Sequence, residues 1–248
     1  MERKYSTTYE GIRVDVVEIK SDERHHAQIS VLGEAGFTKR PFREFRDAAL
    51  EAQGNICIAK FNGSLFFTQG SYTYANGIEK AYGVVHENDD ATWDNNLGFW
   101  HNDGVPFIYP QWHIKKIINE SYVRGAMIAA FGLINNGHHD IRGARYYYDK
   151  AKGRWITEPG RGVYRTKSGR TIIGKKPDGT IVGAVFDGVT GRSGLTGYQT
   201  YLLAKRLGLN NAVCMDGGGS TYGEYKGVPF NNSSRDGANA VGFYIRLK

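Results

Sequence analysis

Residues 194–221 decide the fold, and they read GLTGYQTYLLAKRLGLNNAVCMDGGGST. The first half predicts a helix, because Thr196 is a suitable N-cap and Gly208 can take the left-handed conformation that ends helices. The apolar face of this helix is expected to consist of Tyr198, Tyr201, Leu202 and Leu207. The second half predicts a short strand, NNAVCM, that delivers its C-terminal end into Asp216 and three glycines.

The glycines at 217–219 need an explanation, because glycine loses more backbone freedom on folding than any other residue. Without Cβ atoms, a backbone can press close to a ligand and direct several N–H groups at one phosphate. Ser220 and Thr221 add hydroxyl donors. The spacing does not match a nucleotide P-loop. The run therefore predicts a phosphate-facing loop, and an incidental tight turn is the alternative.

The rest of the chain alternates strand and helix patterns. Strands are expected at 12–20, 26–33, 55–61 and 238–247, and residues 170–188 predict two strands joined by a turn at 177–179. Residues 41–54 predict a helix. Residues 120–137 indicate two strands broken near Gly125 and Gly132, with a helix as the alternative. No linker or repeat is visible, so we expect one α+β domain over 1–248. It includes residues 1–50 and has a mixed or antiparallel sheet core with a few packed helices.

The composition is that of a globular protein, with 40% hydrophobic and 13% aromatic residues in 248. Cys57 and Cys214 lie in apolar runs, and we expect buried thiols rather than a disulfide. No apolar run approaches the roughly 20 residues that span a bilayer, so no membrane partner is expected. The N-terminus lacks a signal-peptide pattern. We expect a protein of the cytoplasm or one carried in a phage particle.

The positive charge is concentrated in residues 142–176, with eleven Lys or Arg against two acids, Asp149 and Glu158. This segment carries +9 whereas the chain carries +7, so the remainder carries −2. A localised basic segment indicates an anionic partner, and a solvated loop is the alternative. Nucleic acid is disfavoured, because no known recognition motif accompanies the charge.

Five motifs occur together in one order: FNGSLFF at 61–67, RTIIG at 170–174, FDG at 186–188, the opening stretch, and NNSSRDGANAVGFYI at 231–245. In order and spacing they resemble the phosphodiester glycosidase family. The resemblance runs from about residue 12 to the end and is strongest from 170 to 221. It implies hydrolysis of a sugar that is joined through its anomeric carbon to a phosphodiester, with release of the free sugar.

The resemblance also implies the site residues. The catalytic candidates are Asp187, Asp216 and Arg170. The candidates for binding substrate or phosphate are Asn62, Gly63, Gly217, Gly218, Gly219, Ser220, Thr221, Asn231, Asn232, Arg235 and Asn239. Two departures from the family pattern are Ser64, where a second glycine is usual, and NNSS, which lacks the usual proline.

The chemistry of the bond fits these residue types. Glycoside cleavage passes through an oxocarbenium-like transition state that a nearby carboxylate stabilises. A phosphate ester is a weakly basic leaving group, so it needs charge neutralisation more than protonation. We expect Arg170 and the backbone N–H groups of residues 217–219 to supply it. One of Asp187 and Asp216 would face the anomeric carbon or its attacking water, and the other would orient sugar hydroxyls or the loop. A turn role is the alternative for both.

The expected substrate is a sugar 1-phosphodiester of a glycan, a teichoic acid or a molecule like a nucleotide sugar. The competing function is a non-catalytic module of a phage particle that binds phosphoglycans such as teichoic acid. We expect no cofactor. A divalent cation is the alternative, at the clusters His86–Asp90 and His138–Asp140, although neither has a known zinc spacing.

Overall fold

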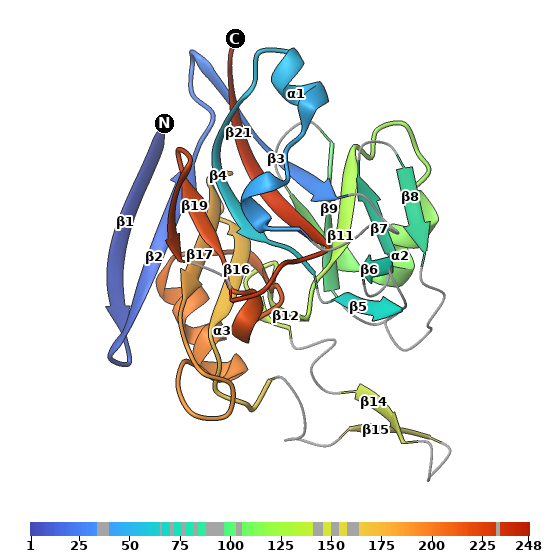
Figure 1. Cartoon of the computed structure of the whole chain (residues 1–248), viewed down its shortest axis with the longest axis vertical. Helices are drawn as coiled ribbons and strands as arrows, with labels where there is room; N and C mark the ends of the chain where they lie inside the picture. Colours follow the sequence, from blue (N-terminus) through green and yellow to red (C-terminus); the bar gives the residue numbers. More distant parts are fainter. Residues whose placement is uncertain are drawn as a thin grey trace.

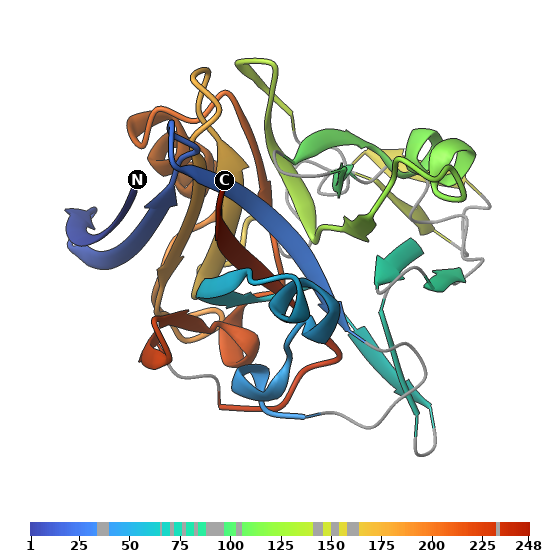
Figure 2. The same cartoon turned by 90° about the horizontal axis from the view of Figure 1, so that it is seen from above.

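A computed structural model gives the fold of the chain (Figures 1 and 2). It describes residues 1–33, 40–64, 66–69, 72–75, 78–81, 84–87, 97–102, 106–140, 146–149, 154–157, 164–231 and 234–248. This part of the chain is rich in strands and has few helices, and all its strand pairs are antiparallel. The expected sheet core is therefore present in its antiparallel form.

The first sheet has seven strands in the order β1-β2-β17-β16-β18-β12-β13. They are β1 (Glu2–Tyr9), β2 (Ile12–Ile19), β12 (Phe131–Asn135), β13 (His138–His139), β16 (Arg170–Lys175), β17 (Ile181–Phe186) and β18 (Asn211–Cys214). β17 and β18 both pair antiparallel with β16, which lies between them. They therefore run in the same direction, and their C-terminal ends meet at one edge of the sheet.

The second sheet has five strands in the order β20-β19-β4-β21-β3. They are β3 (His25–Gly33), β4 (Ile56–Asn62), β19 (Gly223–Tyr225), β20 (Val228–Asn231) and β21 (Asn239–Leu247). Asn62 at the end of β4 lies opposite Ala240 at the start of β21. Two polar motif residues, Asn62 and Asn239, are thereby brought to one end of this sheet.

The third sheet has the order β10-β9-β11-β7-β8 and lies beside β3 (Figure 2). Its strands are β7 (Ile78–Ala81), β8 (Val84–Glu87), β9 (Leu97–His101), β10 (Phe107–Pro110) and β11 (Gly125–Ile128). Helix α2 (Gln111–Ile117) contributes Ile114 to a small core with Ala126 and Ile128. Two hairpins form two-stranded sheets of their own: β5 (Phe66–Gln69) with β6 (Tyr72–Ala75), and β14 (Tyr146–Asp149) with β15 (Arg154–Thr157). The β14–β15 hairpin extends away from the larger sheets (Figure 1).

The main core lies between the first and second sheets and includes Ile173, Val213, Phe61 and Phe243. Each fully buried side chain of this kind contributes about 1.5–3 kcal/mol. Helix α3 (Gly197–Arg206) covers the other face of the first sheet. The 3₁₀ turn η1 (Phe42–Glu44) and helix α1 (Ala48–Ala52) lie against the other face of the second. The central strands β16, β17 and β18 are thus buried on both faces.

Helix α3 confirms its predicted ends and part of its predicted face, since Leu207 is buried and Tyr201 packs against the same core. The Thr196 hydroxyl accepts from the Gln199 N–H at 3.2 Å and the Gln199 side chain accepts from the Thr196 N–H at 3.0 Å, which is a capping box. Gly208 follows with φ +77°. The buried helix residues are Gly197, Thr200, Leu203 and Ala204. Tyr198 is 52% exposed, because these small residues let α3 approach the sheet while the tyrosines pack at its rim.

Two other predicted elements need correction. The helix expected at 41–54 is divided into η1 and α1, because the Asp47 carboxylate accepts from the Leu50 N–H at 3.0 Å and starts a new helix. The strands expected within 120–137 are present, but they are separated at residues 129–130 rather than at Gly132. The predicted turn after β16 is confirmed, with Gly179 at φ +83°.

The two cysteines are free thiols, as predicted, and Cys214 is buried, whereas Cys57 is only partly buried instead of fully buried as expected. Burial raises the pKa of Cys57 to about 11 and that of Cys214 to about 12, so both stay protonated at neutral pH. Among the described residues, no helix has the length and apolar character needed to cross a membrane.

Candidate active site

An open hollow of about 590 Å³ lies where the C-terminal ends of β17 and β18 meet. Its lining residues are Asp187, Gly188, Val189, Thr190, Ser193, Gly218, Gly219 and Ser234. The parallel direction of β17 and β18 explains why the Asp-Gly pair and the glycine loop share this edge. Thr190, Ser193 and Ser234 were not predicted. The small polar residues that follow Asp187 in the sequence could have indicated that this segment lines the site.

Asp187 supplies a carboxylate to the hollow. It is exposed, and its Oδ1 accepts a hydrogen bond from the Asn231 side-chain amide at 2.7 Å. Asn231 is buried at the end of β20. Asn231 therefore orients one oxygen of the Asp187 carboxylate, while the carboxylate itself faces the open hollow.

Asp216 lies beneath the glycine loop rather than in the hollow. Only 5% of the residue is exposed. Its two oxygens accept from the Gly217 N–H at 2.8 Å and from the Arg235 guanidinium at 2.7 Å. Burial raises the pKa of Asp216, against the opposing effects of Ser220, Arg235 and the Gly217 N–H. This carboxylate therefore fixes Arg235 and the start of the loop.

The glycine loop forms a compact turn, with the 3₁₀ segment η3 at Gly218–Ser220. The Gly217 N–H donates to Asp216 and the Gly218 N–H donates to the Gly169 carbonyl at 3.0 Å. The hydroxyl of Thr221 donates back to the Gly218 carbonyl at 2.6 Å. The expectation that successive N–H groups meet one phosphate needs correction, because two of these donors are already used within the protein.

Gly218→Ala is expected to lower the free energy of unfolding by about 1–2 kcal/mol, because Gly218 has φ +59°, where an L-residue is strained. An added Cβ would also lie 2.7 Å from the Thr190 hydroxyl. Urea unfolding measures the loss. Gly219→Ala is the control, since Gly219 has no positive φ and its nearest atom is the rotatable Ser234 hydroxyl. An equal loss in both variants contradicts this account.

Arg170 is one of the most deeply buried residues, 1% exposed. Its guanidinium donates to the Thr166 carbonyl at 2.9 Å and lies 5.2 Å from the Phe131 ring centroid. A Cβ on Gly217 would lie 3.3 Å from its Nη1, so the side chain supports the loop from beneath. Arg170 is therefore not on the surface of the hollow, and its predicted phosphate contact needs correction for this structure.

Arg235 is the guanidinium that reaches the surface beside the loop. Half of its side chain, 51%, is exposed, and it is held by Asp216 and by the Ser220 hydroxyl. Its Cζ lies 5.1 Å from the Phe66 ring centroid. A Cβ on Gly219 would lie 3.8 Å from its Cδ, which places Arg235 against the loop that lines the hollow. This arrangement holds a guanidinium in a fixed orientation beside the loop.

Asn62, Gly63 and Asn239 connect the two sheets below the site. The buried Asn62 amide donates to the Asp216 carbonyl at 2.9 Å and accepts from the Tyr222 N–H at 3.0 Å. The Asp216 N–H donates to the Gly63 carbonyl at 3.0 Å, and the Gly63 N–H donates to the Asn239 carbonyl at 3.1 Å. These motif residues hold the loop, and none lines the hollow. Asn232 lies outside the described residues.

Glu79 is a buried carboxyl group that was not predicted, and no motif marks it. Its Oε2 accepts from the Asn239 side-chain amide at 2.9 Å, and the same amide donates to the Ser64 hydroxyl at 2.9 Å. Within the described residues, Glu79 Oε1 has no hydrogen-bond partner. Burial raises the pKa of Glu79 to about 7, against the lowering effect of Asn239.

Glu79→Gln is expected to stabilise the protein at neutral pH. The folded state keeps a proton up to about pH 7, whereas the unfolded chain releases it near 4.5, so stability falls as pH rises through this window. The full cost is roughly 3 kcal/mol above pH 7, and glutamine removes it. Urea unfolding from pH 4.5 to 7.5 tests this against Glu44→Gln, an exposed control. Equal pH dependence in Glu79→Gln and wild type contradicts the buried-acid assignment.

The proposed metal clusters are only partly within the described residues. Asp89 and Asp90 lie outside them, and so do the side chains of His86 and Glu87. His139 stacks on Tyr201 with ring centroids 3.8 Å apart and bonds to the Tyr164 hydroxyl at 2.8 Å. No group of three metal-ligating side chains that could hold an ion occurs in the described part of the chain. Most of the basic segment 142–176 has no described side chains.

Comparison with solved structures shows the same fold in other proteins. A match with TM-score 0.66 and 15% identity covers all of this chain and 82% of the zebrafish N-acetylglucosamine-1-phosphodiester alpha-N-acetylglucosaminidase catalytic domain, auto-inhibited by its pro-peptide. A putative exported protein of Burkholderia pseudomallei matches with TM-score 0.57 and 13% identity over 94% of this chain and 74% of its own. A hypothetical protein of Synechocystis matches with TM-score 0.56 and 12% identity over 98% of this chain and 61% of its own.

Comparison with curated protein sequences gives no significant match. The family model described as phosphodiester glycosidase matches residues 55–245, which is most of the chain and includes β4, the hollow and β21. The chain belongs to the phosphodiester glycosidase family.

Proposed function

We propose that this protein hydrolyses a sugar 1-phosphodiester at the anomeric carbon and releases the free sugar. Two observations carry the proposal: an oriented carboxylate, Asp187, lines the hollow, and an oriented guanidinium, Arg235, lies against the glycine loop that lines it. The family membership supports a hydrolase of glycosyl phosphodiesters. It does not favour a non-catalytic phosphoglycan-binding module.

The chemistry follows from the two charges. The bond between the anomeric carbon and the phosphate oxygen breaks, and the electron pair leaves with the phosphate. Arg235 stabilises the charge of the departing phosphomonoester by hydrogen bonds that a planar guanidinium makes to two oxygens. Asp187 stabilises the oxocarbenium-like centre or takes a proton from the water that attacks it. Water supplies the oxygen of the new sugar hydroxyl.

The remaining motif residues keep this pair in place. Asn231 positions Asp187, and Asp216 with Ser220 positions Arg235. Arg170 and Asn62 support the glycine loop from within the fold. Catalytic geometry must be held to a fraction of an ångström, which explains why so many motif residues are buried instead of facing the substrate.

The test is a set of sugar 1-phosphodiesters that differ in the sugar and in the group on the other side of the phosphate. The expected result is release of free sugar and of a phosphomonoester in equal amounts. The Asp187→Asn variant, purified in the same way, is the control for contaminating hydrolases. Binding of these compounds without turnover by the wild-type protein would support the binding module instead.

A further inference from the structure

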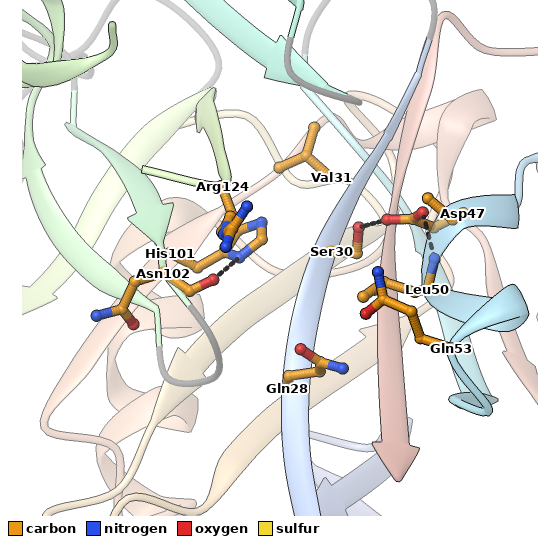
Figure 3. A pocket seen from close by; sticks show the side chains of 10 residues that line it. Gln28, Ser30, Val31, Asp47, Leu50, Gln53, His101, Asn102 and Arg124 are labelled. Atoms are coloured by element: carbon orange, nitrogen blue, oxygen red, sulfur yellow. Dashed lines mark hydrogen bonds between the residues drawn. The ribbon is translucent and has the colours of Figure 1, made fainter. Parts of the chain in front are cut away.

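A second polar hollow lies beside the middle of strand β3. It has a volume of about 260 Å³ and is lined by residues of β3 and helix α1, by His101 and Asn102 at the end of β9, and by Arg124 just before β11 (Figure 3). It shares no lining residue with the hollow at Asp187. A small ligand in this hollow therefore does not touch the candidate active site.

The floor of this hollow is built from buried polar side chains. Gln28, Ser30, Asp47 and His101 are each no more than 9% exposed. The Ser30 hydroxyl donates to Asp47 at 2.7 Å, and the Asp47 carboxylate also accepts the Leu50 N–H (Figure 3). Burying polar groups costs free energy unless they are hydrogen-bonded. Ligand pockets combine an apolar lining with a few placed polar groups, and here Val31 and Leu50 lie beside these polar side chains, which favours a ligand-binding role.

The rim of the hollow is cationic. Figure 3 shows Arg124 above His101 and Asn102 on one wall, facing Ser30 and Gln53 on the other. A neighbouring hollow of about 450 Å³ shares Gln28, Leu50, Gln53 and Arg124 and adds His26, Arg246 and Lys248. The two hollows together contain three cations, Arg124, Arg246 and Lys248, two histidines, and one acidic side chain, Asp47, whose carboxylate is already hydrogen-bonded. A groove of one charge concentrates ligands of the opposite charge.

The combination of groups selects a class of ligand. Guanidinium and ammonium groups favour phosphate, and the amides of Gln53 and Asn102 suit sugar hydroxyls, whereas the Gln28 side-chain amide already donates to Asn55. We propose that this groove is a second binding site, separate from the candidate active site, that holds a phosphorylated saccharide. Such a site would retain a phosphate-bearing glycan while the hollow at Asp187 acts on another part of it.

The experiment titrates the full-length protein with glucose 1-phosphate and follows the side-chain amide NMR signals of Gln28, Gln53 and Asn102. These signals report this groove and not the hollow at Asp187. The expected result is saturable shifts, with at least tenfold weaker binding of both glucose and inorganic phosphate. No saturable shift, or equal affinity for inorganic phosphate, would overturn the proposal.

Variants identify the groove as the place of binding. Arg124→Gln is expected to weaken glucose 1-phosphate binding at least tenfold, because Arg124 lines both hollows. Arg206→Gln, on the exposed end of α3, should bind as wild type does. If Arg124→Gln has a lowered melting temperature, Gln53→Ala on the opposite wall provides a second test, and it should also weaken glucose 1-phosphate binding. Equal affinity in all variants contradicts the site.

A failure of this site is distinguishable from a failure of the proposed function. Arg124→Gln should hydrolyse small sugar 1-phosphodiesters at the wild-type rate. Arg235→Lys should bind glucose 1-phosphate in the groove with wild-type affinity while its kcat/KM for hydrolysis falls at least tenfold. Loss of groove binding in Arg235→Lys would mean that the two sites are not separate, and it would overturn the proposal.

Discussion

Asp187→Asn is expected to reduce kcat/KM for a sugar 1-phosphodiester by about 10³-fold or more, which corresponds to about 4 kcal/mol of lost transition-state stabilisation. The exchange keeps the shape of the side chain and an oxygen that can accept from Asn231. It removes the negative charge that faces the hollow. Because Asp187 is exposed and touches no buried partner except Asn231 among the described contacts, the melting temperature should stay close to that of wild type.

Two comparisons sharpen this test. Asp178→Asn, in the turn between β16 and β17, removes an exposed carboxylate and should leave activity unchanged. Asp216→Asn should reduce activity less than Asp187→Asn, because Asp216 acts through Arg235 and does not line the hollow. The assignment is wrong if Asp216→Asn abolishes turnover while Asp187→Asn keeps it within a few-fold of wild type.

Arg235→Lys is expected to reduce kcat/KM at least tenfold, or about 1.4 kcal/mol, and by up to a hundredfold. An ammonium group cannot make two parallel hydrogen bonds to phosphate, and it cannot hold Asp216 and Ser220 together as the guanidinium does. Most of the loss should appear in kcat, since the charge on the leaving phosphate develops in the transition state. Stopped assays of free sugar at varied substrate concentration separate kcat from KM.

Arg170→Lys is the matched variant for this prediction. Arg170 is buried and holds the Thr166 carbonyl, so its replacement should lower the melting temperature more than Arg235→Lys does. Suppose that Arg170→Lys is stable but inactive while Arg235→Lys is fully active. That result would show that Arg170, and not Arg235, contacts the phosphate. The double variant of Asp216→Asn and Arg235→Lys should lose less than the sum of the two single losses, because the two residues act as one unit.

The sequence predicted those elements whose signals are local. The Thr196 cap, the Gly208 end of α3 and the turn at Gly179 all depend on residues within a few positions of one another. The buried face of α3 was predicted only in part, because the apolar pattern pointed to Tyr198 and Leu202 whereas the small residues Thr200 and Ala204 lie against the sheet at the same helical spacing as Leu207. The division of residues 41–54 at Asp47 follows from one capping carboxylate that competes with a continuous helix.

The candidate site shows the same limit. The motifs pointed to strand ends that the structure brings together, since Asp187, Asp216 and Arg170 all lie at one edge of the first sheet. Which of these side chains points outward depends on partners far away in the chain. Asp216 is turned inward by Arg235, and Asp187 is held facing the hollow by Asn231. Glu79 escaped notice because its burial against Asn239 joins two sheets that no local pattern connects.

The central claim is that the bond broken lies between the anomeric carbon and the phosphate oxygen. It is tested most directly by hydrolysis of a sugar 1-phosphodiester in water enriched in heavy oxygen, with both products analysed by mass spectrometry. This account predicts that the label enters the free sugar and that the phosphomonoester carries none. Label in the phosphomonoester, with unlabelled sugar, would show attack at phosphorus and would contradict the account.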